Sequence, residues 1–244
     1  MWRKKLIAAM LLVSLAGLAL CFYPKISGSI LDAERKEPAQ SIVERIERAR
    51  SEYEAGNRFS HELSNEIPRF NEPLWNAMVA YNKDIWEHLQ AGLSDPWAYE
   101  QPSFILGDYG MEDEAFGVLL IPSLDLEMPL YLGASYANLA KGAAHLSQTS
   151  LPIGGSNTNC VIAGHRGWKG ATFFRYLETI EIGAKVYVMN YWETLEYTVV
   201  ETKVIDPDQV DELLIQPGKD MLTLFSCYQR SGKRRFAVYC ERTS

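Results

Sequence analysis

The chain has 244 residues, of which 47% are hydrophobic and 23% charged, a balance typical of a folded protein that excludes an intrinsically disordered one. Lysine and arginine number 24 against 31 aspartate and glutamate, a formal net charge of -7. This negative charge opposes binding to a phosphate backbone, so nucleic acid is not expected among the partners. The four cysteines form no Cys-x-x-Cys pair, which excludes a zinc ribbon and a dense disulfide framework.

Residues 1–23 are predicted to be a membrane anchor. Arg3-Lys4-Lys5 precedes an apolar run from Leu6 to Phe22, and a basic flank before an apolar run is typical of a secretory signal or signal anchor. No small-x-small cleavage site follows cleanly, so a retained anchor is favoured over a cleaved signal peptide. The positive end should stay in the cytoplasm. Because no second long apolar run occurs, the chain from about Tyr23 onwards is expected outside the cytoplasm.

Residues 24–110 are predicted to be a helical N-terminal region. Ser41-Ile42-Val43-Glu44 has the pattern of a capping box, and the apolar residues from Ile42 to Tyr53 then recur at helical spacing. A second amphipathic helix is expected to begin at Pro73 and to stop at Gly92.

Residues 111–244 are predicted to be mainly β. Turn residues separate short runs rich in β-branched and aromatic residues, and many short strands with little helix between them favour a closed or nearly closed β-barrel. The expected strands are Phe116–Ile121, Leu126–Leu132, Cys160–Ala163, Lys185–Tyr191, Leu195–Val204, Met221–Ser226 and Phe236–Tyr239.

Cys227 and His165 are the candidate reactive residues, because each follows a strand-like run, where reacting side chains often lie. A thiol with a pKa of about 8.5 is only slightly ionised at neutral pH, so a nucleophilic cysteine needs a nearby histidine or cation. Arg235 opens the last expected strand, and a hairpin would return it close to Cys227, where it could stabilise an oxyanion. Other cations that could assist the thiol are Arg166, Arg230, Lys233 and Arg234.

These candidates lie in motifs whose order and spacing resemble those of the sortases. The motifs are Ala163-Gly164-His165-Arg166-Gly167, Thr223-Leu224-Phe225-Ser226-Cys227 and Arg235. The second is similar to the T-L-x-T-C signature, with Ser226 in place of the second threonine, a change that keeps the hydroxyl. The segments Val118–Pro122, Pro129–Tyr131 and Lys141–Pro152 resemble the pilus-assembling class C sortases in particular. The resemblance covers roughly residues 70–244 and is specific because three ordered motifs match.

The resemblance implies a mainly β fold with an eight-stranded sortase-type β-barrel, and a transpeptidase that uses no metal and no cofactor. Cys227 would attack the Thr–Gly carbonyl of an LPxTG-like sorting signal to form a thioacyl enzyme. His165 would protonate the leaving amine and later deprotonate the incoming one, while Arg235 would stabilise the oxyanion. The acceptor would be a pilin lysine, giving pilus polymerisation; the alternative is a peptidoglycan amine, giving cell-wall anchoring. The enzyme would be membrane-tethered at a Gram-positive type cell surface.

The segment Ser94-Asp95-Pro96-Trp97 has two interpretations. By itself it is typical of a helix start, with Ser94 or Asp95 as N-cap and Pro96 in the first turn. It is also similar to the Asp-Pro-aromatic lid of class C sortases, in which Asp95 would pair with Arg235 and Trp97 would cover Cys227. The sortase resemblance on both sides of the segment favours the lid.

A zinc site built from Cys160, His165, Cys227 and Cys240 is the main structural alternative, but residues five apart on a strand point to opposite faces. Cys160 and Cys240 are therefore interpreted as small core residues, with a disulfide between them left open. His145 is the one competitor to His165 as the partner of Cys227. Two rival functions remain: a papain-like hydrolase, in which water replaces the amine, and a non-catalytic membrane-tethered binding module.

Overall fold

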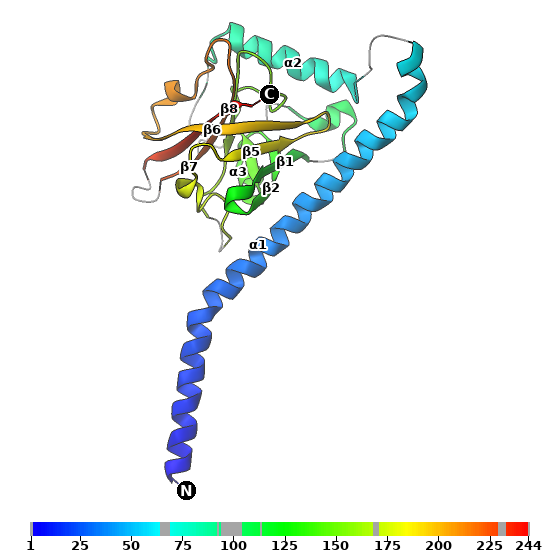
Figure 1. The fold of residues 1–244 in the computed structure, drawn as a ribbon. Helices are drawn as coiled ribbons and strands as arrows, with labels where there is room; N and C mark the ends of the chain where they lie inside the picture. Colours follow the sequence, from blue (N-terminus) through cyan, green and yellow to red (C-terminus); the bar gives the residue numbers. More distant parts are fainter. Residues whose placement is uncertain are drawn as a thin grey trace.

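The structure is a computed structural model, and it describes residues 2–63, 69–91, 93, 104–112, 114–167, 171–228 and 233–243. The long helix α1 (Trp2–Leu63) runs up along one side of a closed β-barrel, and α2 (Glu72–Glu87) lies across the far end of the barrel from the N-terminus (Figure 1). The short helix α3 (Tyr136–Lys141) follows the second strand. Single 3-10 turns are η2 (Leu106–Tyr109), η3 (Pro122–Leu124), η4 (Leu177–Thr179) and η5 (Val210–Leu213).

The predicted helix over residues 42–53 exists, but its predicted start at Ser41 is wrong. Ser41 lies inside α1, and its hydroxyl donates a hydrogen bond to the carbonyl of Pro38 (2.8 Å). The residues before Ser41 are themselves helical, so the amides that a capping box would satisfy already have carbonyl partners within the helix. The apolar face is as expected: Ile42 and Ile46 are buried against the barrel.

The helix α2 begins one residue before the predicted start at Pro73. Asn71 caps it from a left-handed conformation, and its side-chain oxygen accepts a hydrogen bond from the amide of Leu74 (3.3 Å). The spacing predicts a stripe of Leu74, Met78, Tyr81, Ile85 and Leu89. Leu74, Met78 and Ile85 are buried as expected, but α2 already ends at Glu87, and Leu89 beyond it is 79% exposed.

The eight strands close into the barrel that the sequence predicts. Their order around the barrel is β1-β2-β3-β4-β7-β8-β6-β5, and β5 pairs again with β1. The strands are β1 (Ala115–Ile121), β2 (Leu126–Leu132), β3 (Ala143–His145), β4 (Thr158–Ala163), β5 (Lys185–Met189), β6 (Thr194–Ile205), β7 (Asp220–Cys227) and β8 (Arg235–Arg242). Seven match the expected runs to within a few residues. The eighth, β3, has only three residues, too few to show a period.

Alternation along each strand divides the side chains between the barrel interior and its outer face. The interior core draws Leu119, Ile162 and Leu224 from β1, β4 and β7. Their sequence neighbours on the outer face pack beneath α1 and the connecting loops. The outer set includes Val118, Val161, Phe225, Ala237 and Tyr239.

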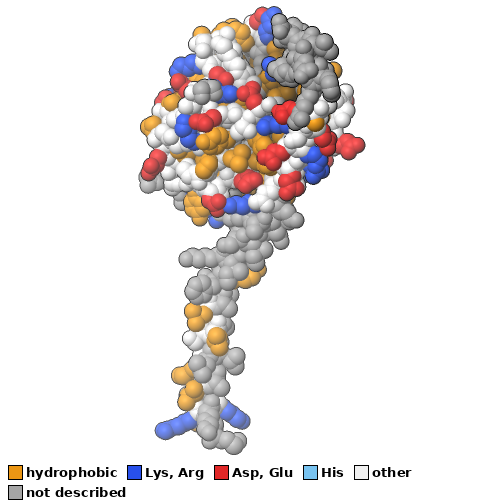
Figure 2. All heavy atoms as spheres, turned by 45° about the vertical axis from the view of Figure 1, so that its right-hand side comes forward, with side chains coloured by type: hydrophobic (Ala, Val, Ile, Leu, Met, Phe, Trp, Pro, Cys, Tyr) orange, Lys and Arg blue, Asp and Glu red, His pale blue; other side chains and the backbone are white. Residues whose placement is uncertain are grey.

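The N-terminal part of α1 extends well beyond the barrel (Figure 1). Lysine and arginine side chains lie at its tip and hydrophobic side chains above them (Figure 2). The exposed apolar residues include Ile7, Met10, Val13, Leu15 and Leu18. Within the residues that the structure describes, no helix combines the length and hydropathy of a membrane span.

His145, the last residue of β3, is fully buried, and the loop that follows the strand holds its ring. The Nε2 atom lies 3.0 Å from the carbonyl oxygen of Thr149. Burial lowers the pKa of His145 to about 4, because a charged imidazolium is poorly solvated there. The ring is therefore neutral at pH 7.

The pH dependence of folding should reveal His145. The unfolded chain takes up this proton near pH 6.5 and the folded chain near pH 4, so the free energy of unfolding should fall by about 3 kcal/mol as the pH drops through this window. Chemical denaturation of wild type and His145→Gln at pH 7, 5.5 and 4.5 measures the difference. The matched control is His88→Gln, at an exposed position; equal pH dependence in all three proteins would contradict this account.

Candidate active site

Strand pairing brings the three predicted site residues to one end of the barrel. The parallel pair β4 and β7 sets Ala163 beside Phe225, and His165 and Cys227 each follow two residues later. The antiparallel pair β7 and β8 sets Cys227 directly opposite Arg235. The alternation of outer-face residues Phe225 and Ala237 places the side chains of Cys227 and Arg235 on the outer face of the barrel.

Arg235 and Cys227 are in contact. Nη1 of Arg235 lies 3.9 Å from Sγ of Cys227, within the range of a hydrogen bond to sulfur. The same nitrogen donates to the carbonyls of Lys233 (3.3 Å) and Arg234 (3.4 Å), so the loop that leads into β8 aims the guanidinium. Arg235 is only 7% exposed. A buried cation beside a thiol favours the thiolate and any negative charge that develops near it.

His165 lies in the loop after β4 and is also buried. Burial lowers the pKa of His165 from its usual range, which favours the neutral imidazole at pH 7. A neutral imidazole can accept a proton from a thiol. Phe173 meets the ring edge-to-face, with ring centroids 6.3 Å apart, and itself has a φ of 42°, a conformation that costs energy for an aromatic residue.

Ser226 ties the histidine loop to the cysteine strand. Its buried hydroxyl donates to the carbonyl of Gly164 (2.8 Å), and the amide of Gly164 donates to the carbonyl of Phe225 (3.1 Å). These two hydrogen bonds hold Gly164, which precedes His165, against Phe225 and Ser226, which precede Cys227. A Cβ at Gly164 would lie 2.8 Å from the ring of Phe174, so the loop needs glycine at this position. The sequence shows that Ser226 keeps a hydroxyl, but not which carbonyl that hydroxyl meets.

The other cysteines lie apart from this site. Cys160 and Cys240 belong to the barrel interior, and burial raises the thiol pKa of both. They flank Leu222 on either side, two strand spacings or about 10 Å apart. This distance exceeds the Cα separation of a disulfide, and both thiols are free. The disulfide that the sequence left open is therefore not formed.

The remaining sequence candidates are separated from Cys227 or lie outside the described residues. His145 is in β3, which β4 separates from β7, so it is not the partner of Cys227. The zinc alternative fails because Cys160 and Cys240 face the interior while Cys227 faces outward. The lid candidates Asp95, Pro96 and Trp97 fall within residues 94–103, which the structure does not describe.

A family model for the sortase domain matches residues 119–243, about half of the chain. Sortase D of Bacillus subtilis (strain 168) is 29% identical over 135 residues, which cover 54% of this chain and 65% of that protein. The chain spans about half to two thirds of the length of the curated relatives it matches.

Solved structures extend the similarity to the N-terminal side of this match. Sortase C1 of group B Streptococcus (GBS) pilus island 1 superposes with a TM-score of 0.65 at 30% identity, covering 73% of this chain and 86% of that chain. Group B Streptococcus pilus island 1 sortase C2 gives a TM-score of 0.60 at 35% identity, covering 69% and 97% respectively.

Ser226 should prove to be a positioning residue. Ser226→Ala removes the donor to the Gly164 carbonyl, and the buried acceptor left behind should lower the free energy of unfolding by about 1–3 kcal/mol. It should also change the pH profile of Cys227 alkylation, because His165 would no longer be fixed. Ser226→Thr retains the hydroxyl and should restore both properties. A purely structural role would appear as lost stability with an unchanged alkylation profile.

Proposed function

The chain belongs to the sortase family, and from this membership we propose that it is a cysteine transpeptidase, with Cys227, His165 and Arg235 as its catalytic residues. The observation that carries the proposal is the direct strand pairing of Cys227 with Arg235, beside the loop that carries His165. The family match begins at residue 119, which supports residues 111–244 as the catalytic domain and residues 24–110 as an N-terminal addition.

In the first half-reaction, neutral His165 takes the thiol proton and Cys227 attacks the Thr–Gly carbonyl of an LPxTG-like sorting signal. The carbonyl oxygen becomes negative, and the guanidinium of Arg235, 3.9 Å from Sγ, is close enough to stabilise it. Collapse breaks the peptide bond. His165 returns its proton to the departing glycine amine, and the threonine carbonyl stays on sulfur as a thioester.

In the second half-reaction, an acceptor amine attacks the thioester. His165 takes the proton that the amine loses, Arg235 again stabilises the oxyanion, and collapse expels the Cys227 thiolate and leaves a new amide bond. The proton lost by the amine is on His165 and the leaving group is the thiolate, so the step needs no cofactor. Water in place of the amine would give hydrolysis, so product analysis with and without an amine acceptor distinguishes a transpeptidase from a papain-like hydrolase.

We propose a lysine side chain of a pilin as the acceptor amine. The support is the structural similarity to sortases C1 and C2 of a streptococcal pilus island, at 30% and 35% identity. The second candidate is a peptidoglycan amine, as in attachment of surface proteins to the wall. Presenting both acceptors to one thioacyl enzyme and comparing the products separates them.

We further propose that the N-terminal part of α1 tethers the enzyme to the membrane, with the barrel outside the cytoplasm. The support is the basic tip, where Arg3 and Lys5 are exposed, followed by exposed apolar side chains (Figure 2). Cations that precede an apolar helix favour a cytoplasmic N-terminus.

Residues 94–97 complete the proposal as a lid. Pro96 fixes its own φ near −65° and biases Asp95 towards an extended backbone, so Trp97 would sit on a semi-rigid arm. An Asp95–Arg235 pair would occupy the guanidinium that the oxyanion needs, and the closed state would be inactive.

The identity of the nucleophile is tested by thioacyl trapping. Cys227→Ala should abolish the adduct with a sorting-signal peptide, as measured by intact-protein mass spectrometry. Cys160→Ala and Cys240→Ala should leave the adduct in place, because both thiols are buried inside the barrel with raised pKa values. An adduct on either of these residues would refute the proposal, and the absence of any adduct in the wild type would favour a non-catalytic binding module.

Arg235 is expected to act through the geometry of its guanidinium as well as its charge. A guanidinium can donate two parallel hydrogen bonds where an ammonium is a point charge. Arg235→Lys should therefore lower the transfer rate on the order of a hundredfold, by analogy with loss of an oxyanion donor. The matched control is Arg234→Lys, one residue earlier and more exposed; an equal loss in the control would reassign the role.

The lid is tested by the accessibility of Cys227. Replacing both Asp95 and Trp97 with alanine should speed alkylation by a small thiol reagent about fivefold, the effect of losing a partly exposed pair of ~1 kcal/mol. The melting temperature should be unchanged. The control is Asp108→Ala, an exposed carboxylate in η2. An unchanged rate in a folded variant would mean that Ser94-Asp95-Pro96 is only a helix start.

A further inference from the structure

A hollow of about 620 Å³ lies at the opposite end of the barrel from Cys227, between α2 and the loop 153–158. Its floor includes Asp220, the first residue of β7, whereas Cys227 is the last. Seven residues at about 3.3 Å each separate the two, roughly 23 Å along the strand. A volume of this size suits a small ligand, and the separation keeps that ligand away from the scissile bond.

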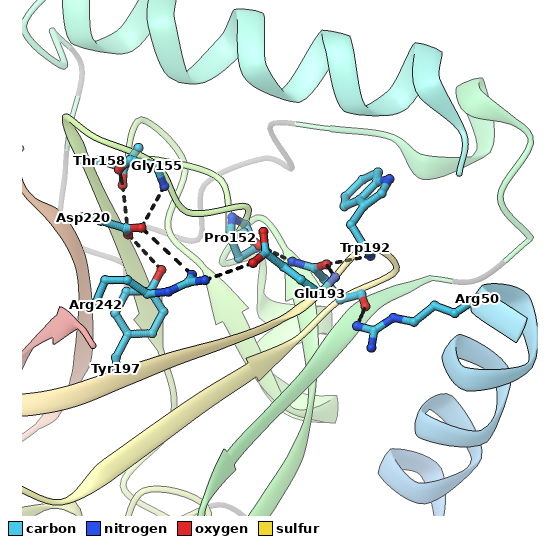
Figure 3. Close-up of polar contacts among 10 residues, drawn as sticks. Arg50, Pro152, Gly155, Thr158, Trp192, Glu193, Tyr197, Asp220 and Arg242 are labelled. Atoms are coloured by element: carbon cyan, nitrogen blue, oxygen red, sulfur yellow. Dashed lines mark hydrogen bonds and ion pairs between the residues drawn. The ribbon is translucent and has the colours of Figure 1, made fainter. Parts of the chain in front are cut away.

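The floor of the hollow is a network of hydrogen bonds and ion pairs (Figure 3). Asp220 accepts from the amide of Gly155 (2.8 Å), the hydroxyl of Thr158 (3.3 Å) and the hydroxyl of Tyr197 (3.0 Å). Arg242 lies 4.0 Å from Asp220 and donates to Glu193 (2.9 Å). The carboxylates of Asp220 and Glu193 thus both accept hydrogen bonds from groups of the protein.

The loop over this floor approaches closely because it contains two glycines with positive φ. A Cβ at Gly154 would lie 3.1 Å from both Nη1 of Arg242 and Oδ2 of Asp220. Any side chain there would crowd the network and narrow the hollow. The floor is therefore rigid and shaped before a ligand arrives, which lowers the cost of binding.

The roof of the hollow is aromatic and cationic. Trp75 and Trp86 are eleven residues, or about three helical turns, apart on α2, so they lie on the same face of the helix. Val79 lies between them and is 43% exposed. The guanidinium of Arg69 lies over the ring of Trp75, 3.9 Å from its centroid. Lys83 is 71% exposed and pairs with Glu87 at 3.7 Å, a weak surface contact that a ligand can replace.

The chemistry of this lining selects a ring-shaped, polar and acidic ligand. An indole face packs against the C–H face of a sugar ring, and polar groups around it hydrogen-bond the sugar hydroxyls. Arg69 covers one face of Trp75, so Trp86 is the aromatic residue assigned this role. Asp220 and Glu193 share the single guanidinium of Arg242. Arg69 and Lys83 add two positive charges, so cations outnumber carboxylates in the lining and the rim attracts an anion. An extended peptide should bind less well than a sugar. Each described strand of the closed barrel has two neighbours, so no free strand edge is available to pair with a peptide.

We propose that the hollow between α2 and the loop 153–158 is a second ligand site that binds acidic glycan, a sugar chain whose rings carry carboxylates. The helix α2, which lines the hollow, lies at the end of the molecule opposite the tip of α1 (Figure 1). Under the extracytoplasmic orientation proposed above, on which the source of the ligand depends, this end faces the cell envelope. Glycan of the envelope would then hold the barrel in a fixed orientation while Cys227 stays accessible to protein substrates.

Calorimetric titration of the full chain tests the site with two matched sugars. A tetrasaccharide of alternating N-acetylglucosamine and N-acetylmuramic acid should bind at least tenfold more tightly than chitotetraose, which has the same backbone without carboxylates. Equal affinities, no binding of either sugar, or tighter binding of a tetrapeptide of aspartate and glutamate would overturn the proposal.

Two variants locate the binding. Trp86→Ala should weaken binding of the acidic tetrasaccharide at least tenfold, and Lys83→Gln, at an exposed position on α2, should weaken it at least fivefold. The matched controls Tyr136→Ala and Lys185→Gln replace an exposed aromatic residue and a lysine outside the hollow and should bind normally. Unchanged binding in both test variants would refute the site.

Transfer of a soluble sorting-signal peptide to an amine separates this proposal from the proposed function. Trp86→Ala should retain that activity, since Trp86 lies at the other end of the barrel. A wild type that binds glycan but transfers no peptide would refute the transpeptidase and leave the glycan site standing. A wild type that transfers peptide but binds no glycan would refute the glycan site and leave the transpeptidase standing.

Discussion

The parallel pairing of β4 with β7 is the constraint on which the candidate active site depends. Parallel strands carry their carboxyl ends to the same edge, so the segments that end in His165 and Cys227 finish side by side. The register is essential, because a slip of one residue would turn Cys227 into the barrel interior. The hydrogen bond from Ser226 to Gly164 spans these two segments, and it holds the register where the side chains emerge.

A second set of contacts holds the opposite end of the barrel to α1. The side-chain oxygen of Asn190 accepts from the amides of Trp192 and Glu193, and its side-chain nitrogen donates to the carbonyl of Pro152 (2.9 Å). Arg50 of α1 donates to the Asn190 carbonyl (Figure 3). One buried asparagine thus joins α1, the β5–β6 turn and the loop over the hollow. The two ends of the barrel are therefore held by separate sets of contacts.

His145 and His165, both buried, show how the surroundings of a histidine decide what it can do. Burial lowers the pKa of both His145 and His165, which favours the neutral ring in each. The ring of His145 contacts a local carbonyl under a loop and is structural. His165 stands at the end of a strand that runs parallel to the strand of Cys227, where a neutral imidazole can exchange protons with a thiol. Burial thus favours the neutral ring in both histidines, but only the strand order places His165 beside the strand of Cys227.

The sequence by itself determined the class of fold, seven of the eight strands and the three candidate catalytic residues, because alternation and ordered motifs are local properties of the chain. It could not show β3, which has three residues, or the true course of α1, whose residues before Ser41 lack a clear helical period. Only the tertiary structure decided that Cys160 and Cys240 are free on either side of Leu222. The hollow beneath α2 could not be predicted from the sequence either, because its tryptophans, glycines and ion pairs come from separate segments spread between residues 75 and 242. The closure of the barrel brings these segments together, and the sequence pattern within any one segment does not predict which others it will meet.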